Sequence, residues 1–185
     1  TDGLVAAGYK DTPSPAANVS PAVTELWNGT SWTETTDLST PTRNYGASSN
    51  GTTSAAFLAG GYTSTESAAT YDWTGAGANI GAWSSGGAMN TARRMLGSAG
   101  TRDSALGFGG VSPPGRRAET ESYNGTSFSE VADLNVARRD TRGCGADNEA
   151  ALCFGGGSDP SPSTTTLTET WNGSSWTEVG DLNTG

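Results

Sequence analysis

The sequence predicts an all-β protein made of four similar small sheets, and three observations carry that prediction. Two fifteen-residue segments are almost the same, TELWNGTSWTETTDL at 24–38 and TETWNGSSWTEVGDL at 168–182. Two aromatic positions and a glycine pair recur about every 48 residues. Gly, Ser and Thr are plentiful, and long runs of Leu, Ile or Val are absent. We therefore expect one domain, 1–185, with approximate repeats 1–42, 43–92, 93–137 and 138–185.

The aromatic and glycine positions align the repeats with one another. The first aromatic position holds Trp27, Tyr71, Tyr123 and Trp171. The second aromatic position holds Trp32, Trp83, Phe128 and Trp176. The glycine pairs are Gly60-Gly61, Gly109-Gly110 and Gly155-Gly156, with Ala7-Gly8 in the same place near the N-terminus.

Each repeat contains signals for four short strands. Apolar runs of strand length end at a glycine pair, as in AAFLAGGY (55–62), ALGFGG (105–110) and AALCFGG (150–156). A variable loop follows, and then a strand runs into Asn-Gly, which is typical of a type I′ hairpin turn. The chain returns as a strand such as SWTEV and passes an Asp-Leu or Met-Asn corner. A segment with arginine then leads into a strand of small residues, as in RRMLGSAG (93–100).

A four-stranded sheet of this size cannot bury its faces alone. Stacking similar sheets around an axis buries these faces and leaves only short edges, which is the arrangement of a β-propeller. We therefore expect a β-propeller with four four-stranded blades. Gly and Ala should lie on the inner strands, and Trp and Tyr farther out, where the space between blades widens.

The first repeat is incomplete, because Thr1-Asp2 aligns with Asp103-Ser104, just before the glycine-pair strand. Its innermost strand is therefore missing. The segment DLNTG (181–185) aligns with the start of the segment 133–148, and the remainder of 133–148 has no counterpart after residue 185 in the sequence. Two interpretations stay open. The chain is part of a larger ring, or an open seam is filled by another chain, most simply a second copy. We expect a longer parent chain, since an unpaired inner edge promotes aggregation.

The pattern resembles Kelch-like repeats over nearly the whole chain. The best match is the fourth repeat, with Gly155-Gly156, Trp171 and Trp176. The sequence motif Glu-x-Trp-Asn-Gly-x-Ser-Trp is also similar to repeats in structural proteins of marine bacterial viruses. These resemblances imply a Kelch-like propeller with a structural or host-recognition role, extracellular or at a virion surface. The second repeat departs from the pattern, because 71–75 reads YDWTG in place of Trp-Asn-Gly.

Composition argues against several classes of function. The formal net charge is −9, Lys10 is the one lysine, and the sequence has no histidine. An acidic chain without a basic run is a poor candidate for nucleic-acid binding. No stretch approaches the roughly 18 apolar residues of a membrane span. Histidine is the usual general base and the commonest metal ligand. We therefore expect no membrane insertion, no metal or other cofactor, and no enzymatic activity.

Arginines supply the first candidate ligand-binding residues. Arg43, Arg93 and Arg138 occupy one repeat position in the alignment, which predicts a ring of guanidinium groups near the axis. Such groups bind the carboxylates of an anionic glycan or a protein partner. The alternative is a structural ion pair, because Glu25, Glu121 and Glu169 also recur.

Further candidates lie outside that position. Arg116 and Arg117 follow Pro-Pro-Gly in a variable loop, where binding residues concentrate. Arg94 and Arg139 complete arginine doublets and add positive charge. Trp73 breaks the aromatic pattern, so we expect it to be the exposed aromatic that stacks on a ligand.

Other recurring residues have structural interpretations. Cys144 and Cys153 lie opposite each other in a predicted hairpin, where two buried thiols are favoured over a cross-strand disulfide. Recurring aspartates predict turn caps rather than calcium ligands, because one carboxylate per repeat makes no cage; they are Asp37, Asp133 and Asp181. Turn chemistry also explains the sequons at Asn28, Asn50, Asn124 and Asn172.

These observations favour a non-catalytic binding or structural module that contacts a glycan or a protein through its blade loops. Two alternatives remain at this stage. One is a secreted carbohydrate-binding lectin, and the other is a non-catalytic fragment of a larger secreted enzyme.

Overall fold

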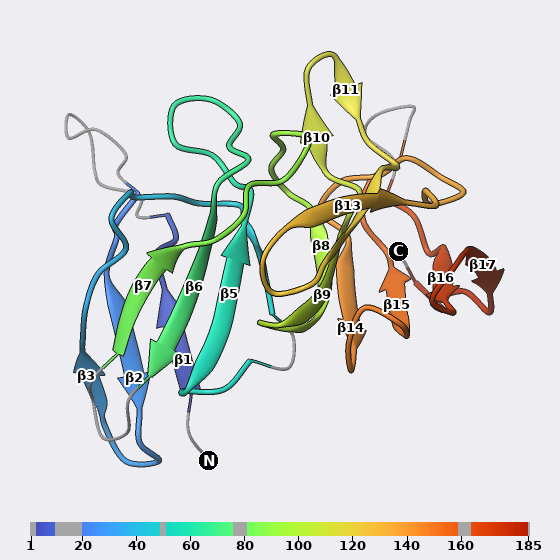
Figure 1. Cartoon of the computed structure of the whole chain (residues 1–185). Helices are drawn as coiled ribbons and strands as arrows, with labels where there is room; N and C mark the ends of the chain where they lie inside the picture. Colours follow the sequence, from blue (N-terminus) through green and yellow to red (C-terminus); the bar gives the residue numbers. More distant parts are fainter. Residues whose placement is uncertain (1–2, 10–19, 49–50, 76–80, 159–163, 185) are drawn as a thin grey trace.

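The computed structural model describes residues 3–9, 20–48, 51–75, 81–158 and 164–184. Within these ranges the chain forms seventeen strands and no helix. The strands build four small antiparallel sheets and one separate hairpin. Figure 1 shows the four sheets following one another in chain order, from the first sheet in blue at one end to the fourth in orange and red at the other.

Each sheet is formed by strands that are close in the sequence. The first sheet contains β1 (Gly3–Ala6), β2 (Thr24–Trp27) and β3 (Trp32–Glu34). The second contains β4 (Gly46–Ala47), β5 (Ala55–Ala59), β6 (Thr70–Gly75) and β7 (Gly81–Ser85). The third contains β8 (Gly97–Thr101), β9 (Ser104–Phe108), β12 (Thr120–Tyr123) and β13 (Phe128–Val131). The fourth contains β14 (Arg142–Gly145), β15 (Ala151–Phe154), β16 (Thr168–Trp171) and β17 (Trp176–Val179). The separate hairpin contains β10 (Val111–Ser112) and β11 (Gly115–Arg116).

The strand order inside each sheet follows the sequence, as in a meander. The first sheet has three strands in the described part of the chain, and β1 forms its inner edge. In the other three sheets a strand rich in small residues, β4, β8 or β14, lies on that inner side. The apolar runs predicted as strands form β5, β9 and β15, and each ends just before its glycine pair.

Neighbouring inner strands are joined through three residues with left-handed backbone. Asn44, Met95 and Asp140 have φ angles of 56°, 58° and 54°. The amide of Met95 donates to the carbonyl of Asn44 at 2.7 Å, and the amide of Asp140 donates to the carbonyl of Met95 at 2.9 Å. This geometry is uncommon outside glycine. Its repetition therefore marks one place where successive sheets are held in register.

The core lies between the faces of successive sheets. One cluster joins Ala99, Leu106, Phe108 and Leu134 of the third unit to Ala151, Cys153, Trp171 and Trp176 of the fourth. A similar cluster joins Phe57 and Ala59 of the second sheet to Ala105, Tyr123 and Phe128 of the third. Burial of these side chains supplies the main driving force for stacking the sheets.

The hairpin aromatics form one tilted or stacked pair in each sheet. Their ring centroids lie 5.3 Å apart for Trp27–Trp32, 5.3 Å for Trp73–Trp83, 4.6 Å for Tyr123–Phe128 and 5.4 Å for Trp171–Trp176. The first aromatic of the second sheet is therefore Trp73, and the sequence alignment that placed Tyr71 there is wrong. A longer β6–β7 connection caused the shift by two residues.

The prediction that Trp73 is an exposed ligand-binding aromatic is also wrong. Its side chain is 0 % exposed, and it packs in a cluster with Leu26 and Ala56 between the first two sheets. Its indole Nε1 donates to the carbonyl of Thr53 at 2.9 Å. A buried tryptophan with a satisfied N–H is a core residue.

The Asn-Gly turns differ from the predicted type I′ geometry. Trp27 pairs with Trp32, so four residues form the loop between β2 and β3. The side-chain oxygen of Asn28 accepts from the amides of Thr30 and Ser31, both at 2.9 Å. Positive φ is found at Gly29 and not at Asn28. The asparagine therefore acts as a side-chain cap of the loop, and Asn124 and Asn172 repeat this arrangement.

The recurring aspartates each cap the start of a strand that lies thirteen residues earlier in the chain, not an amide of a tight turn. The carboxylates of Asp37, Asp133 and Asp181 accept from the amides of Thr24, Thr120 and Thr168 at 3.2, 3.4 and 3.3 Å. Asn50 lies outside the described residues.

The two cysteines point to opposite faces of the fourth sheet. Cys144 pairs with Leu152, and Cys153 pairs with Gly143, so the thiols are not opposite each other. Both cysteines are free, with Cys144 exposed and Cys153 buried. The prediction of two buried thiols is therefore wrong for Cys144. Burial raises the pKa of the Cys153 thiol to about 11.

A tyrosine between the second and third sheets gives a testable titration. Tyr123 donates its hydroxyl to Asp72 Oδ2 at 3.1 Å. Burial, together with the nearby Asp72 carboxylate, raises the pKa of Tyr123 to about 12. A raised pKa means that the folded state favours the neutral phenol. This contribution to stability is complete below the ordinary pKa of 10.0 and is lost as the pH rises through about 12.

We expect the ultraviolet absorbance titration of Tyr123→Phe to lack one phenol that ionises at about 12 in the wild type. Circular dichroism at each pH provides the control that the fold persists. If the variant instead lacked a phenol that ionises near 10.0, the raised pKa would not belong to Tyr123.

Candidate ligand-binding face

Two of the arginines predicted to bind a ligand are buried in ion pairs. Arg93 Nη2 lies 2.8 Å from Glu121 Oε1, and both side chains are 0 % exposed. Arg93 Nη1 donates to the carbonyls of Gly109 and Glu119 at 3.0 and 2.5 Å. Burial lowers the pKa of Arg93, and the Glu121 carboxylate opposes that shift. Arg93 is therefore a structural residue without access to a ligand.

The fourth sheet repeats this ion pair. Arg138 Nη2 lies 2.5 Å from Glu169 Oε1, and Arg138 Nη1 donates to the carbonyl of Leu167 at 2.8 Å. Glu169 Oε2 accepts from both the backbone and the side-chain amide of Asn135 at 2.8 Å. The ligand-binding prediction is therefore wrong for Arg93 and Arg138, and the alternative of a structural pair is confirmed for both.

The second sheet lacks this ion pair. Thr42 occupies the place of Arg93 and Arg138, and Tyr71 occupies the place of Glu121 and Glu169. Both members of the pair are thus replaced together, which avoids a buried charge without a partner. The expectation that Arg43 shares a position with Arg93 is wrong by one residue.

Backbone bridges show which arginines are equivalent. Arg43, Arg94 and Arg139 each form a two-hydrogen-bond bridge, with Tyr62, Val111 and Gly157 respectively. All three arginines lie at the end of the molecule where the apolar strands stop at their glycine pairs. We call this end, which also carries the β10–β11 hairpin at the top of Figure 1, the loop face.

Arginines and tyrosines alternate on the loop face. The guanidinium carbon of Arg43 lies 4.7 Å from the ring centroid of Tyr9 and 5.0 Å from that of Tyr62. The guanidinium carbon of Arg94 lies 4.9 Å from the same Tyr62 ring. Arg94 also pairs with Glu66 at 3.5 Å. The aromatic rings hold the guanidinium planes in place without neutralising them.

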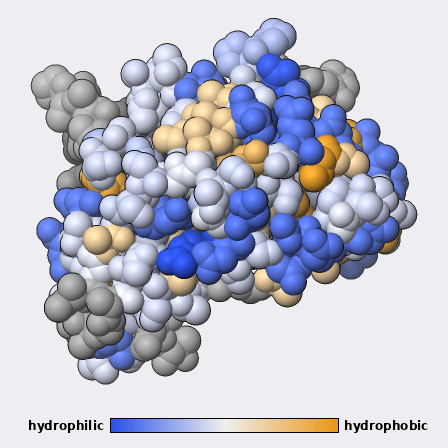
Figure 2. Space-filling model, in the orientation of Figure 1, coloured by the Kyte–Doolittle hydropathy of each residue, from blue (hydrophilic) through white to orange (hydrophobic). Residues whose placement is uncertain are grey.

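Arg116 and Arg117 belong to the same face, through the β10–β11 hairpin. Arg117 donates to the carbonyl of Pro113 at 2.8 Å and pairs with Glu119 at 3.4 Å. Arg116 lines a cavity of about 360 Å³ together with Arg139 and Asp140. Figure 2 shows hydrophilic residues over this hairpin.

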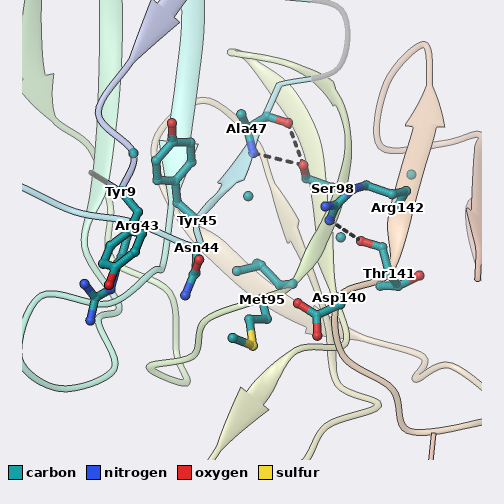
Figure 3. Close-up of a pocket in the computed structure, with 15 residues that line it drawn as sticks. Tyr9, Arg43, Asn44, Tyr45, Ala47, Met95, Ser98, Asp140, Thr141 and Arg142 are labelled. Atoms are coloured by element: carbon teal, nitrogen blue, oxygen red, sulfur yellow. Dashed lines mark hydrogen bonds between the residues drawn. The ribbon is translucent and has the colours of Figure 1, made fainter. Parts of the chain in front are cut away.

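A larger cavity of about 430 Å³ opens at the centre of the loop face. Figure 3 shows Tyr9 and Arg43 on one side of it and Arg142 on the other, with Asn44, Met95 and Asp140 between them. The three left-handed residues that join the inner strands therefore line this cavity. Their backbone conformation fixes its rim.

Among the described residues, six arginines lie on the loop face, although the whole chain carries a net charge of −9. The arginines of this face are Arg43, Arg94, Arg116, Arg117, Arg139 and Arg142. The carboxylates beside them are Glu66, Glu119 and Asp140. The sequence analysis singled out Arg43, Arg116 and Arg117 and noted Arg94 and Arg139 as positive spots. It missed Tyr9, Tyr62 and Arg142, whose positions after the glycine pairs and at the start of β14 are the only sequence signals for them.

In the described ranges, no group of three or more His, Cys, Asp or Glu side chains is arranged to hold a metal ion. Those ranges also contain no helix that is long and apolar enough to cross a membrane.

The comparisons with known proteins concern the fold. No protein-family model matches the sequence, and no curated protein matches it. Among solved structures, the chain is similar to YjhT, which has a β-propeller-like fold, with a TM-score of 0.70 and 12% sequence identity. The match covers 86% of this chain and 52% of the YjhT chain, so this chain spans about half the length of YjhT.

Proposed function

We propose that the chain is a non-catalytic binding module of the Kelch-like β-propeller class, with four blades, and that its loop face binds an anionic glycan. Three properties support the fold: the four sheets in chain order, the aromatic pair in each sheet and the likeness to YjhT. Location at the surface of a virus particle or a cell is supported by the resemblance of the repeat motif to repeats in viral structural proteins.

The observation that carries the binding function is the alternation of arginines and tyrosines beside the central cavity. Guanidinium groups bind carboxylates with two parallel hydrogen bonds. Aromatic rings stack on the apolar faces of sugar rings and also orient the guanidinium groups. Tyr9 is 50% exposed and lies against Arg43, so one site offers both kinds of contact.

Binding of polygalacturonate, a polymer of carboxylated sugars, tests this proposal by titration calorimetry. We expect saturable binding that weakens with added salt, and no binding of neutral dextran. The double variant R43A/R94A should bind at least about tenfold more weakly, which corresponds to about 1.4 kcal/mol. The matched control is Arg102→Ala, because Arg102 at the β8–β9 turn is 29% exposed, like Arg94, and is paired with Asp103.

Equal loss of affinity in Arg102→Ala and R43A/R94A would show non-specific attraction and would contradict the site. Absence of saturable binding to the carboxylated polymer would contradict the glycan proposal. Saturable binding to an acidic protein in that case would assign the loop face to a protein partner instead.

A further inference from the structure

We propose that one carboxylate of the ligand binds to Arg43 and Asn44, in a cavity of about 380 Å³ on the loop face. Acidic side chains keep anions away from the two equivalent arginines, Arg94 and Arg139. The ligand class for this subsite is a uronate, a sugar that carries a carboxylate, so the subsite rests on the function proposed above. It adds to that function the position of the anion and the residues that set its specificity.

The repeats place three arginines in the same backbone setting. Arg43, Arg94 and Arg139 each form a backbone bridge with two hydrogen bonds, and each precedes a residue with left-handed backbone. Any difference in anion binding among the three positions therefore comes from the side chains. The residues that follow the three arginines are Asn44, Met95 and Asp140.

The guanidinium group of Arg43 contacts aromatic rings and keeps its full charge. Its central carbon lies 4.7 Å from the ring centroid of Tyr9 and 5.0 Å from that of Tyr62. Among the residues that the structure describes, no carboxylate forms an ion pair with Arg43. The two rings orient the planar group, so that its charge and its paired donors are available to a carboxylate.

Asn44 adds a second donor beside this guanidinium group. It is exposed and lines the same cavity as Arg43. Asparagine adopts left-handed backbone more readily than most residues, and its side-chain amide donates hydrogen bonds. A carboxylate that pairs with Arg43 can therefore also accept from Asn44. Tyr9, which is 50% exposed, offers its ring to the sugar that carries this carboxylate.

Arg94 lines the same cavity, but its charge is opposed by a neighbouring carboxylate. Arg94 Nη1 lies 3.5 Å from Glu66 Oε1, and the Glu66 side chain is only 17% exposed. Met95 follows Arg94 and has a thioether in place of a donor. An anion that approaches Arg94 is therefore repelled by Glu66, which makes Glu66 a specificity-determining residue.

Arg139 is also opposed by a carboxylate, which here belongs to the following residue. Arg139 Nη1 lies 3.4 Å from Asp140 Oδ2, and the Asp140 side chain is 52% exposed. The position that holds a neutral donor in Asn44 thus holds a negative charge in Asp140. This third position therefore disfavours a carboxylate ligand.

Titration calorimetry with trigalacturonate, a short oligomer of carboxylated sugars, tests the subsite. Arg43→Lys keeps the charge and loses the paired donors, so the dissociation constant should rise at least about tenfold. Asn44→Asp places a carboxylate where Asp140 has one, and a rise of at least about tenfold is expected again. The matched control is Arg139→Ala, which should change the dissociation constant by less than about threefold.

Removal of the charge of Glu66 should strengthen binding. In Glu66→Gln the charge of Arg94 becomes available, so the dissociation constant should fall at least about threefold. The double variant E66Q/R94A should lose this gain, because the released guanidinium group is absent. A merely structural role of Glu66 would not produce a gain, and unchanged or weaker binding in Glu66→Gln would overturn its assignment.

The outcomes separate this subsite from the proposed function. If neither trigalacturonate nor polygalacturonate binds saturably, the glycan function itself fails. If trigalacturonate binds and both Arg43→Lys and Asn44→Asp keep the wild-type affinity, only the subsite is overturned. Equal losses in Arg43→Lys and Arg139→Ala would also overturn it, as would binding of the polymer without binding of the short oligomer. Circular dichroism of each variant shows whether it is folded.

Discussion

Arg138→Met should lower the free energy of unfolding by about 3–5 kcal/mol, because it leaves the buried carboxylate of Glu169 without its cation. Both side chains of this pair are almost completely buried, at 0% and 1% exposure. Urea denaturation followed by tryptophan fluorescence measures the change. The size of the effect comes from the uncompensated charge, since an intact buried pair contributes little net stability.

The neighbouring arginine supplies the control for this prediction. Arg139 is 37% exposed and pairs with Asp140 at 3.4 Å, so Arg139→Met should change the free energy of unfolding by less than about 1 kcal/mol. The double variant R138M/E169L removes both charges and should recover part of the loss. Equal destabilisation by the two single variants would show that the ion pair does not carry the effect.

Trp73→Ala should lower the free energy of unfolding by about 3–5 kcal/mol, because it opens a cavity between the first and second sheets. The side chain is fully buried and contacts a cluster that includes Leu26 and Ala56. The change also leaves the carbonyl of Thr53 without the indole donor. Guanidinium chloride denaturation gives the free energy directly.

Tyr9→Ala serves as the comparison for this aromatic truncation. Tyr9 is half exposed, so its removal opens no cavity, and we expect a change within about 1 kcal/mol. A small effect of Trp73→Ala would mean that the second sheet rearranges to fill the space.

The sequence predicted the strands well where a residue pattern is compatible with only one local structure. Apolar runs that end in two glycines form β5, β9 and β15, because a short buried strand needs little more than continuous apolar residues. The Asn-Gly turns were correctly placed but given the wrong geometry. The reason is that an asparagine side chain can cap a four-residue loop as readily as its backbone can adopt positive φ.

The candidate site was harder to predict, because adjacent arginines have opposite environments. In the doublets Arg93-Arg94 and Arg138-Arg139, the first arginine is buried beside a glutamate and the second lies on the loop face. Two identical residues in sequence give no sign of which one faces inward. The single arginine of the second repeat was therefore matched to the wrong partner. The replacement of Glu by Tyr71 was the signal that could have corrected it.

Each buried ion pair has both of its partners inside one repeat: Arg93 with Glu121, and Arg138 with Glu169. Gene duplication or deletion of a whole repeat therefore adds or removes cation and anion together. The ion-pair positions that belong to the second sheet hold Thr42 and Tyr71, so this sheet lacks cation and anion at once. Because cation and anion lie within one repeat, the number of repeats can change during evolution without leaving an unpaired charge in the core.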